Sequence, residues 1–194
     1  MYSMLSKSAL TLVLALMPAL ALAHSGHGEA SGFAAGFLHP ATGLDHLVAM
    51  LAVGIWSAQA TRHVWRLPLA FAALLLTGAV FAMAGMGFPA IEPMIAASLL
   101  VIGLLLAMRA QLSAAVSVGL IGGFALFHGA AHGVELAAAA NPALALAGMT
   151  LGTLLIHCVG LGIGRGLLRM QQNWTRALGG AVSLFGVGLL AGLA

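Results

Sequence analysis

Charged side chains are scarce in this sequence. Asp, Glu, Lys and Arg make up 6% of its 194 residues, while hydrophobic residues make up 62%. A soluble domain usually carries about 25% charged residues, because water must wet its surface, so this composition excludes an ordinary soluble fold. A protein that faces lipid has no such requirement, and the 26 glycines are also typical of membrane helices. We therefore expect a protein embedded in the lipid bilayer.

The sequence also has little cysteine, few basic residues and no phosphate-binding loop, and each of these argues against a class of function. The single cysteine, Cys158, excludes an intramolecular disulfide and a thiolate metal cage, and its apolar surroundings indicate a packing residue. The net charge of +3 comes from few, scattered basic residues, which argues against a nucleic-acid partner. The chain contains no G-x4-G-K-[ST] loop, so it has no visible ATPase motif. Nothing in the sequence indicates an oligomeric state.

Residues 1–23 are predicted to be a cleavable signal peptide. Lys7 supplies a positive start, residues 9–17 form an apolar stretch, and Ala21-Leu22-Ala23 is an A-x-A cleavage site. The alternative is an uncleaved anchor helix, although the apolar stretch is short for a span of about 20 residues. Cleavage leaves residues 24–33 as a short histidine-containing segment outside the membrane, followed by a membrane domain over residues 34–194.

Six apolar segments follow the signal peptide. They predict an all-α polytopic bundle of six transmembrane helices. Polar residues, glycines and prolines separate the segments, and they mark turns between helices. The expected segments are 34–58, 68–87, 92–108, 112–137, 143–164 and 175–193.

The arginines predict the orientation of this bundle. They all lie in or beside the first, third and fifth connections: Arg62, Arg66, Arg109, Arg165, Arg169 and Arg176. The positive-inside rule places those connections in the cytoplasm. The signal peptide independently places the mature N-terminus outside, and six spans return the C-terminus to the same side. We expect a multi-pass protein of the bacterial inner (plasma) membrane with both mature termini extracytoplasmic.

The first cluster of ionisable residues lies at the start of the first segment and contains His39, Asp45 and His46. The two histidines are seven residues apart, so a continuous helix would place both on one face. Pro40 and Gly43 leave open the alternative that the helix unwinds there and aims the side chains differently. Met50, one turn beyond His46, is a candidate thioether ligand on the same face.

The second cluster lies late in the fourth segment and contains His128, His132 and Glu135. The spacing of four between the histidines suits two imidazoles that grip one ion from one helix, and Glu135 falls on the same face. The first and fourth segments run in opposite directions, so both clusters lie toward the extracytoplasmic side. We expect them to form one joint metal site, with two inverted three-helix halves around it.

Imidazoles and carboxylates together suit zinc, copper, iron and nickel. Asp45 and Glu135 are interpreted either as metal ligands or as acceptors that fix a histidine tautomer. The alternative for both clusters is hydrogen bonding between helices, although four histidines and two carboxylates exceed what packing needs. Glu92, at the start of the third segment, is interpreted as a helix cap.

Three other histidines are weaker candidates. His157 lies in the middle of the fifth segment and is either an onward ligand along a path or a packing residue. His24 would be the new N-terminus after cleavage, and its amine and imidazole, with His27, would form an external metal collector. The alternative for these two is a flexible polar tail.

The motifs resemble those of a known family. His39 to His46 fits H-x5-D-H, and Phe127 to Glu135 fits F-H-G-x-A-H-G-x-E. With a signal peptide and six spans, the whole chain resembles the HupE/UreJ family of nickel and cobalt permeases. The resemblance implies transport of Ni2+ or Co2+ for hydrogenase or urease rather than a bound prosthetic group. By this resemblance, seven residues match signature positions of the family: His39, Asp45, His46, Phe127, His128, His132 and Glu135.

Two other functions are compatible with the same residues. An intramembrane metal-dependent hydrolase would hold zinc through the histidines and activate water with Glu135. A metal sensor or assembly protein would bind the ion without transporting it. We expect a transporter and no enzymatic activity, and the choice of nickel follows from the family resemblance alone.

Overall fold

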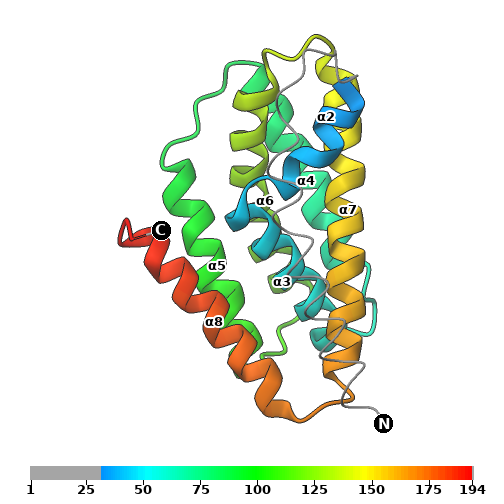
Figure 1. Ribbon diagram of the computed structural model, residues 1–194, viewed down its shortest axis with the longest axis vertical. Helices are drawn as coiled ribbons and strands as arrows, with labels where there is room; N and C mark the ends of the chain where they lie inside the picture. Colours follow the sequence, from blue (N-terminus) through cyan, green and yellow to red (C-terminus); the bar gives the residue numbers. More distant parts are fainter. Residues whose placement is uncertain (1–31, 194) are drawn as a thin grey trace. The chain divides into compact units, whose positions relative to one another are not determined.

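The computed structural model describes residues 32–193, and every regular element in that range is helical. The predicted signal peptide, His24 and His27 lie outside the described residues. Figure 1 shows the arrangement of the helices, together with a short 3-10 turn, η1. Their bounds are α2 Gly32–Leu38, η1 His39–Ala41, α3 Leu44–Ala60, α4 Arg66–Met83, α5 Ile91–Met108, α6 Ala114–Leu136, α7 Pro142–Leu167 and α8 Gln172–Leu190.

The last five predicted segments each correspond to one helix, α4 to α8, with ends within four residues of those expected. Local signals explain several of these ends. The Asn141 side chain accepts a hydrogen bond from the Leu144 amide at 3.1 Å, and Pro142 occupies the first position of α7, where its missing N–H does no harm. Ser113 caps α6 in the same way by accepting from the Val116 amide.

The first predicted segment is not one continuous helix. The segment Gly32–Ala41, which comprises α2 and η1, is bent by 76° relative to α3 at a break over residues 42–43. Pro40 lies in η1, and Gly43 precedes α3 with an extended backbone (φ −91°, ψ 121°). The Thr42 hydroxyl donates to the His39 carbonyl at 2.7 Å and helps to fix this break. The expectation of an unbroken helix over 34–58 is therefore wrong, and the unwound alternative is correct.

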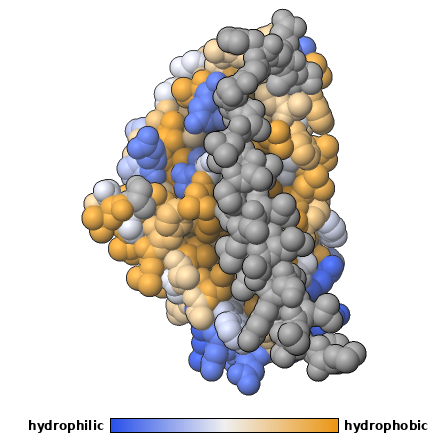
Figure 2. Space-filling model, in the orientation of Figure 1, coloured by the Kyte–Doolittle hydropathy of each residue, from blue (hydrophilic) through white to orange (hydrophobic). Residues whose placement is uncertain are grey.

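Four of the described helices, α4 to α7, are long and apolar enough to cross a membrane, and the bent pair α2–η1–α3 makes a fifth candidate. α8 does not meet the same criterion, because polar residues such as Gln172, Asn173 and Arg176 dilute its apolar sequence. The chain is thus a multi-pass helical membrane protein, and the count of six spans stays a prediction. Figure 2 shows hydrophobic side chains over most of the visible coloured surface, as lipid contact requires.

Three helix pairs provide most of the packing: α4 with α6, α5 with α8, and α3 with α7, which also packs on α2. Glycines permit the closest approaches. Gly129 and Gly133 of α6 lie against the backbone of Leu75 and Ala79 in α4, where no Cβ would fit. The shared core includes the fully buried Trp56.

Helices α3 to α8 run alternately in opposite directions (Figure 1). Every arginine lies where α3, α5 and α7 end or α4 and α8 begin, and we call this the arginine end. The described acidic residues lie where α3 and α5 begin and α6 ends, and we call this the carboxylate end. The two kinds of charge are therefore segregated to opposite ends of the helices.

Candidate metal centre

A cavity of about 740 Å3 opens at the carboxylate end, between the starts of α3 and α5 and the end of α6. The helix break before α3 turns both His39 and His46 toward this cavity. Its polar lining brings together residues from both predicted clusters: His39, Thr42, Asp45, His46, Glu92, His132 and Glu135.

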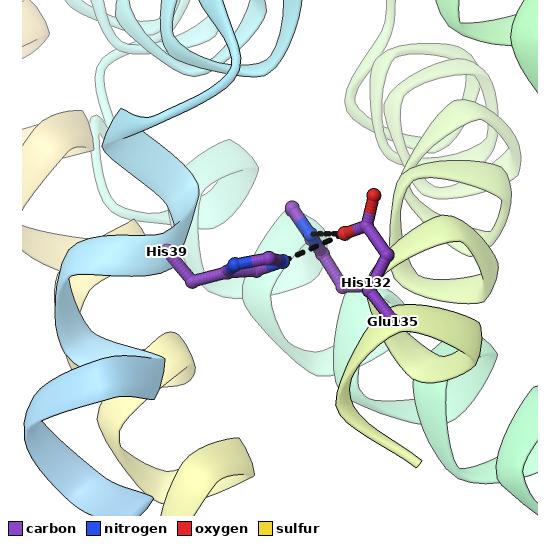
Figure 3. Close-up of side chains that lie close together, drawn as sticks. All are labelled: His39, His132 and Glu135. Carbon is purple, nitrogen blue, oxygen red and sulfur yellow. Dashed lines mark hydrogen bonds and ion pairs between the residues drawn. The ribbon is translucent and has the colours of Figure 1, made fainter. Parts of the chain in front are cut away.

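The outer part of the site joins η1 to α6 (Figure 3). Glu135 Oε2 accepts a hydrogen bond from His39 Nε2 at 2.7 Å and a longer one from His132 Nδ1 at 3.4 Å. One ligand atom from each of these three residues lies within 4.8 Å of the others, so they are placed to hold one metal ion. His39 and Glu135 are partly exposed to the cavity, whereas His132 is buried.

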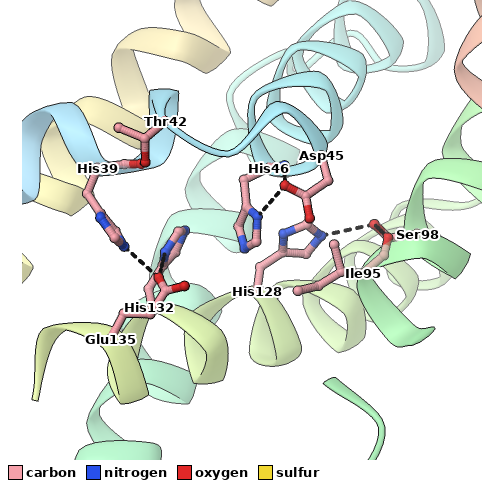
Figure 4. Close-up of polar contacts among 9 residues, drawn as sticks. All are labelled: His39, Thr42, Asp45, His46, Ile95, Ser98, His128, His132 and Glu135. Atoms are coloured by element: carbon pink, nitrogen blue, oxygen red, sulfur yellow. Dashed lines mark hydrogen bonds and ion pairs between the residues drawn. The ribbon is translucent and has the colours of Figure 1, made fainter. Parts of the chain in front are cut away.

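Asp45 holds His46 in position (Figure 4). Its Oδ1 accepts from the His46 amide at 2.8 Å and from the His46 ring Nδ1 at 2.9 Å. Because an ionised carboxylate only accepts, Nδ1 carries the proton and Nε2 keeps its lone pair. In this structure Asp45 is thus an acceptor that fixes a tautomer, which is one of the two roles expected for it.

His128 is held by a residue that the sequence did not single out. The Ser98 hydroxyl of α5 donates to the Ile95 carbonyl at 2.6 Å, so its oxygen is left to accept from His128 Nε2 at 2.9 Å (Figure 4). This arrangement places the His128 proton on Nε2 and leaves the lone pair on Nδ1. Serine is common in membrane helices as a packing residue, and no pattern in the sequence connects position 98 to position 128.

The imidazole rings form a row that leads from the cavity into the protein. Ring centroids are 4.8 Å apart for His39 and His132, 4.3 Å for His132 and His46, and 4.7 Å for His46 and His128. α3 and α6 make little direct backbone contact, so these rings fill the space between the two helices. His128 is fully buried at the inner end of the row.

Each of the buried imidazoles has one nitrogen without a partner among the described residues: His46 Nε2, His128 Nδ1, His132 Nε2 and His157 Nε2. A buried polar atom left unpaired costs about 1–3 kcal/mol, and native proteins avoid such atoms unless they have a role. Four unpaired imidazole nitrogens in one bundle are therefore a strong indication of ligand chemistry.

His157 lies deeper, on α7. Its Nδ1 donates to the Thr153 carbonyl at 2.7 Å, which leaves Nε2 free. The ring of Phe71, from α4, separates it from the row: the Phe71 centroid lies 5.6 Å from that of His128 and 5.0 Å from that of His157. Met50, the candidate thioether ligand, is fully buried in the hydrophobic core and does not line the cavity.

Glu92 does not cap a helix, which is the role expected for it. It lies in the first turn of α5, where its charge suits the helix dipole, but the residue at the cap position is Ala90 and no side chain caps the helix. Glu92 instead lines the cavity. The site therefore has three carboxylates around its opening, of which the sequence had assigned two.

Comparisons with known proteins identify the family of the chain. No solved structure matches the chain. The chain is 38% identical over 191 residues to Protein HupE of Rhizobium leguminosarum bv. viciae, and the match covers 96% of this chain and 98% of that protein. The family model for HupE / UreJ protein matches residues 12–189, which includes both histidine clusters and the seven described helices except the last residue of α8. The chain therefore belongs to the HupE/UreJ family.

Proposed function

We propose that this protein carries a divalent transition metal ion, nickel or cobalt, across the membrane to supply metal enzymes such as hydrogenase or urease. The observation that carries the proposal is the row of imidazoles that leads from an open cavity into the bundle, each buried ring with one unpaired nitrogen. Imidazole nitrogens suit nickel, as they also suit zinc, copper and iron. The choice between metals rests on the family.

The ion enters at the carboxylate end. Glu92, Asp45 and Glu135 attract a cation to the cavity, and His39, His132 and Glu135 are placed to bind it first. Binding there replaces the hydrogen bonds that Glu135 accepts from the two histidines. The bound ion thus offsets the partial desolvation of that carboxylate.

The ion then moves inward from ring to ring. His46 and His128 offer lone pairs on Nε2 and Nδ1, with their protons already held by Asp45 and Ser98. Beyond Phe71, His157 provides a further nitrogen. Because several neutral donors follow one another along the path, the ion can leave each one for the next, as conduction requires. Met50 is given no part in this path, because it does not line the cavity.

Two inverted halves would explain how the path opens to the other side. If spans one to three (α2–α3, α4 and α5) correspond to spans four to six (α6, α7 and α8), then α3 corresponds to α6, α4 to α7 and α5 to α8. The α3–α7 pair is then equivalent to the α6–α4 pair, and the α5–α8 pair is equivalent to itself. These are the three pairs that dominate the packing. In inverted-repeat transporters the two halves exchange conformations and expose the site to alternate sides. The ion gradient, the membrane potential or cytoplasmic trapping of the metal would supply the driving force.

The orientation and the N-terminal residues are part of the same proposal. The arginine end faces the cytoplasm and the carboxylate end faces outward, with a signal peptide removed after residue 23. His24 and His27 then collect metal outside the membrane.

Deletion of residues 24–29 should reduce uptake at limiting nickel and leave uptake at saturating nickel unchanged. Equal uptake by both proteins at all concentrations would remove the collector from the proposal.

Uptake of radioactive nickel into proteoliposomes tests the main proposal. The parent should accumulate nickel, and His128→Ala should not, because it removes the most deeply buried ring of the row. His63→Ala is the matched control, since His63 is an exposed histidine at the arginine end, and it should transport like the parent. A folded parent that binds nickel but never accumulates it would be a sensor or assembly protein. Turnover of a lipid or peptide would instead support the hydrolase.

A further inference from the structure

A second polar cavity, of about 290 Å3, lies at the arginine end of the described helices. It is bounded by the end of α3, the end of α5 and the start of α8, at the opposite end of the helices from both histidine clusters. Its polar lining consists of Gln59, Arg109, Gln111, Gln172 and Arg176. No step of the proposed transport path uses these residues.

Gln59 is an unsatisfied polar side chain in the wall of this cavity. Both polar atoms of its amide, Nε2 and Oε1, are buried without a hydrogen-bond partner among the described residues. An amide that loses its water on folding and gains no partner destabilises the protein by about 1–3 kcal/mol per group. Both atoms have almost no accessible surface, so the Gln59 side chain must rotate toward the cavity before a ligand there can accept a hydrogen bond from Nε2 and remove part of that cost.

Arg109 gives an independent indication. It ends α5 in the left-handed conformation, with φ 52° and ψ 40°, and its amide N–H bonds back to the last turn of the helix. This position normally favours glycine, because any other residue has a Cβ that the conformation disfavours. Nothing about the turn requires arginine there. Arg109 lines the cavity, and its guanidinium group is the part that glycine would not supply.

The charge of this cavity is uncompensated. Neither Arg109 nor Arg176 forms an ion pair within residues 32–193, and no acidic residue lines the cavity. The described carboxylates all lie at the opposite end of the helices. Two guanidinium groups with amide donors beside them match the oxygens of a phosphate group, which accepts several hydrogen bonds at once.

We propose that this cavity binds the phosphate of an anionic phospholipid headgroup. Basic pockets between membrane helices at the level of the headgroups are typical sites for such lipids. The surroundings place the cavity at that level: Met108, which lines it, is 74% exposed, and Trp174, two residues from Arg176, is 58% exposed. Tryptophan is enriched at the membrane interface, and an exposed methionine offers a surface for acyl chains.

The test measures lipid binding by the purified full-length protein in neutral detergent, by thermal stability and by native mass spectrometry. Phosphatidylglycerol should bind and raise the melting temperature more than phosphatidylcholine, which has the same phosphate but also a choline cation that the two arginines repel. Inorganic phosphate is the third arm, and it should have no effect at millimolar concentration. Each arginine removed should weaken phosphatidylglycerol binding by about fivefold.

The variants are Arg109→Gly and Arg176→Gln. Arg109→Gly is informative because glycine suits the left-handed turn, so the protein should fold at least as well as the parent while it loses the lipid. Arg62→Gln is the matched control: it removes one arginine from the same end but from a different cavity. Equal weakening by Arg62→Gln would reduce the effect to general surface charge and overturn the site. Stabilisation by inorganic phosphate alone would overturn the lipid as its occupant.

Discussion

At the scale of single residues, hydrogen bonds determine which nitrogen of each imidazole is available. Asp45 holds the proton of His46 on Nδ1, Ser98 holds that of His128 on Nε2, and the Thr153 carbonyl holds that of His157 on Nδ1. The partner of a metal-binding histidine is known to set both ring orientation and ligand strength. The residues that hold the rings should therefore matter nearly as much as the rings themselves.

Ser98→Ala should weaken nickel binding by about 10–100-fold, which is typical of losing the partner of a metal-binding histidine. The variant removes the acceptor for His128 Nε2–H and leaves all the histidines in place. Isothermal titration with nickel in detergent provides the measurement.

Ser183→Ala is the control, because Ser183 is also a buried serine but bonds the Leu100 carbonyl, away from the histidines. It should bind nickel like the parent. If both serine variants bound equally well, His128 would not depend on Ser98.

His157→Leu separates the two interpretations of that residue. Leucine fills a similar volume and removes a buried nitrogen that has no partner, so the melting temperature should stay the same or rise slightly. Nickel uptake into proteoliposomes should fall at least tenfold if His157 lies on the path. A lower melting temperature with unchanged uptake would identify His157 as a packing residue.

At the scale of elements, the break between α2 and α3 is the feature that forms the cavity. It orients His39 and His46 toward α6 from two helices that meet at 76°. Gly43 lies close to the residues that follow it: a Cβ built there would lie 2.9 Å from Asp45 Oδ1 and 3.4 Å from His46 Nδ1. The same two atoms form the hydrogen bond that fixes His46.

Gly43→Ala should therefore disturb the Asp45–His46 pair and weaken nickel binding about tenfold, within the range for loss of a histidine's partner. Gly87→Ala is the matched control, because Gly87 also lies at the carboxylate end but has no neighbour within 4 Å of a built Cβ. Nickel titration and melting temperature should both be measured. Unchanged nickel affinity in Gly43→Ala would show that the pair tolerates the methyl group.

The lengths and ends of the helices were predictable, and the break was predictable only as an alternative. Long apolar runs and residues such as Asn141 and Pro142 act locally, so they can be recognised along the chain. The two clusters were expected at similar depth because their helices run in opposite directions. The roles of Ser98 and Phe71 were not predictable, since both depend on contacts between helices that are distant in sequence.

At the scale of the whole molecule, α8 determines the number of spans. It packs closely on α5 through Gly103 and Gly179, although its sequence is less apolar than those of the other helices. A helix that is covered by the bundle on one side needs less apolar surface than an isolated one. We therefore retain six spans as a prediction.

Reporter fusions at residue 194 test that count and the orientation. Alkaline phosphatase, which is active only outside the cytoplasm, should be active when fused at this position. Green fluorescent protein fused at the same position and exported by the same route should not fluoresce. Fusions at residue 170, in the connection before α8, should give the opposite pattern. A C-terminal fusion that behaves like the one at residue 170 would mean that α8 does not cross the membrane.

The segregation of charge to opposite ends of the helices makes the molecule an electric dipole along the membrane normal. In a cell whose interior is negative, each elementary charge that crosses the full membrane potential changes in energy by about 2.3 kcal/mol per 100 mV. In the proposed orientation, with the arginine end inside and the carboxylate end outside, the field would stabilise the inserted protein. For the proposed transport, the same field would favour inward movement of a divalent ion with twice the energy per ion that a monovalent ion would gain.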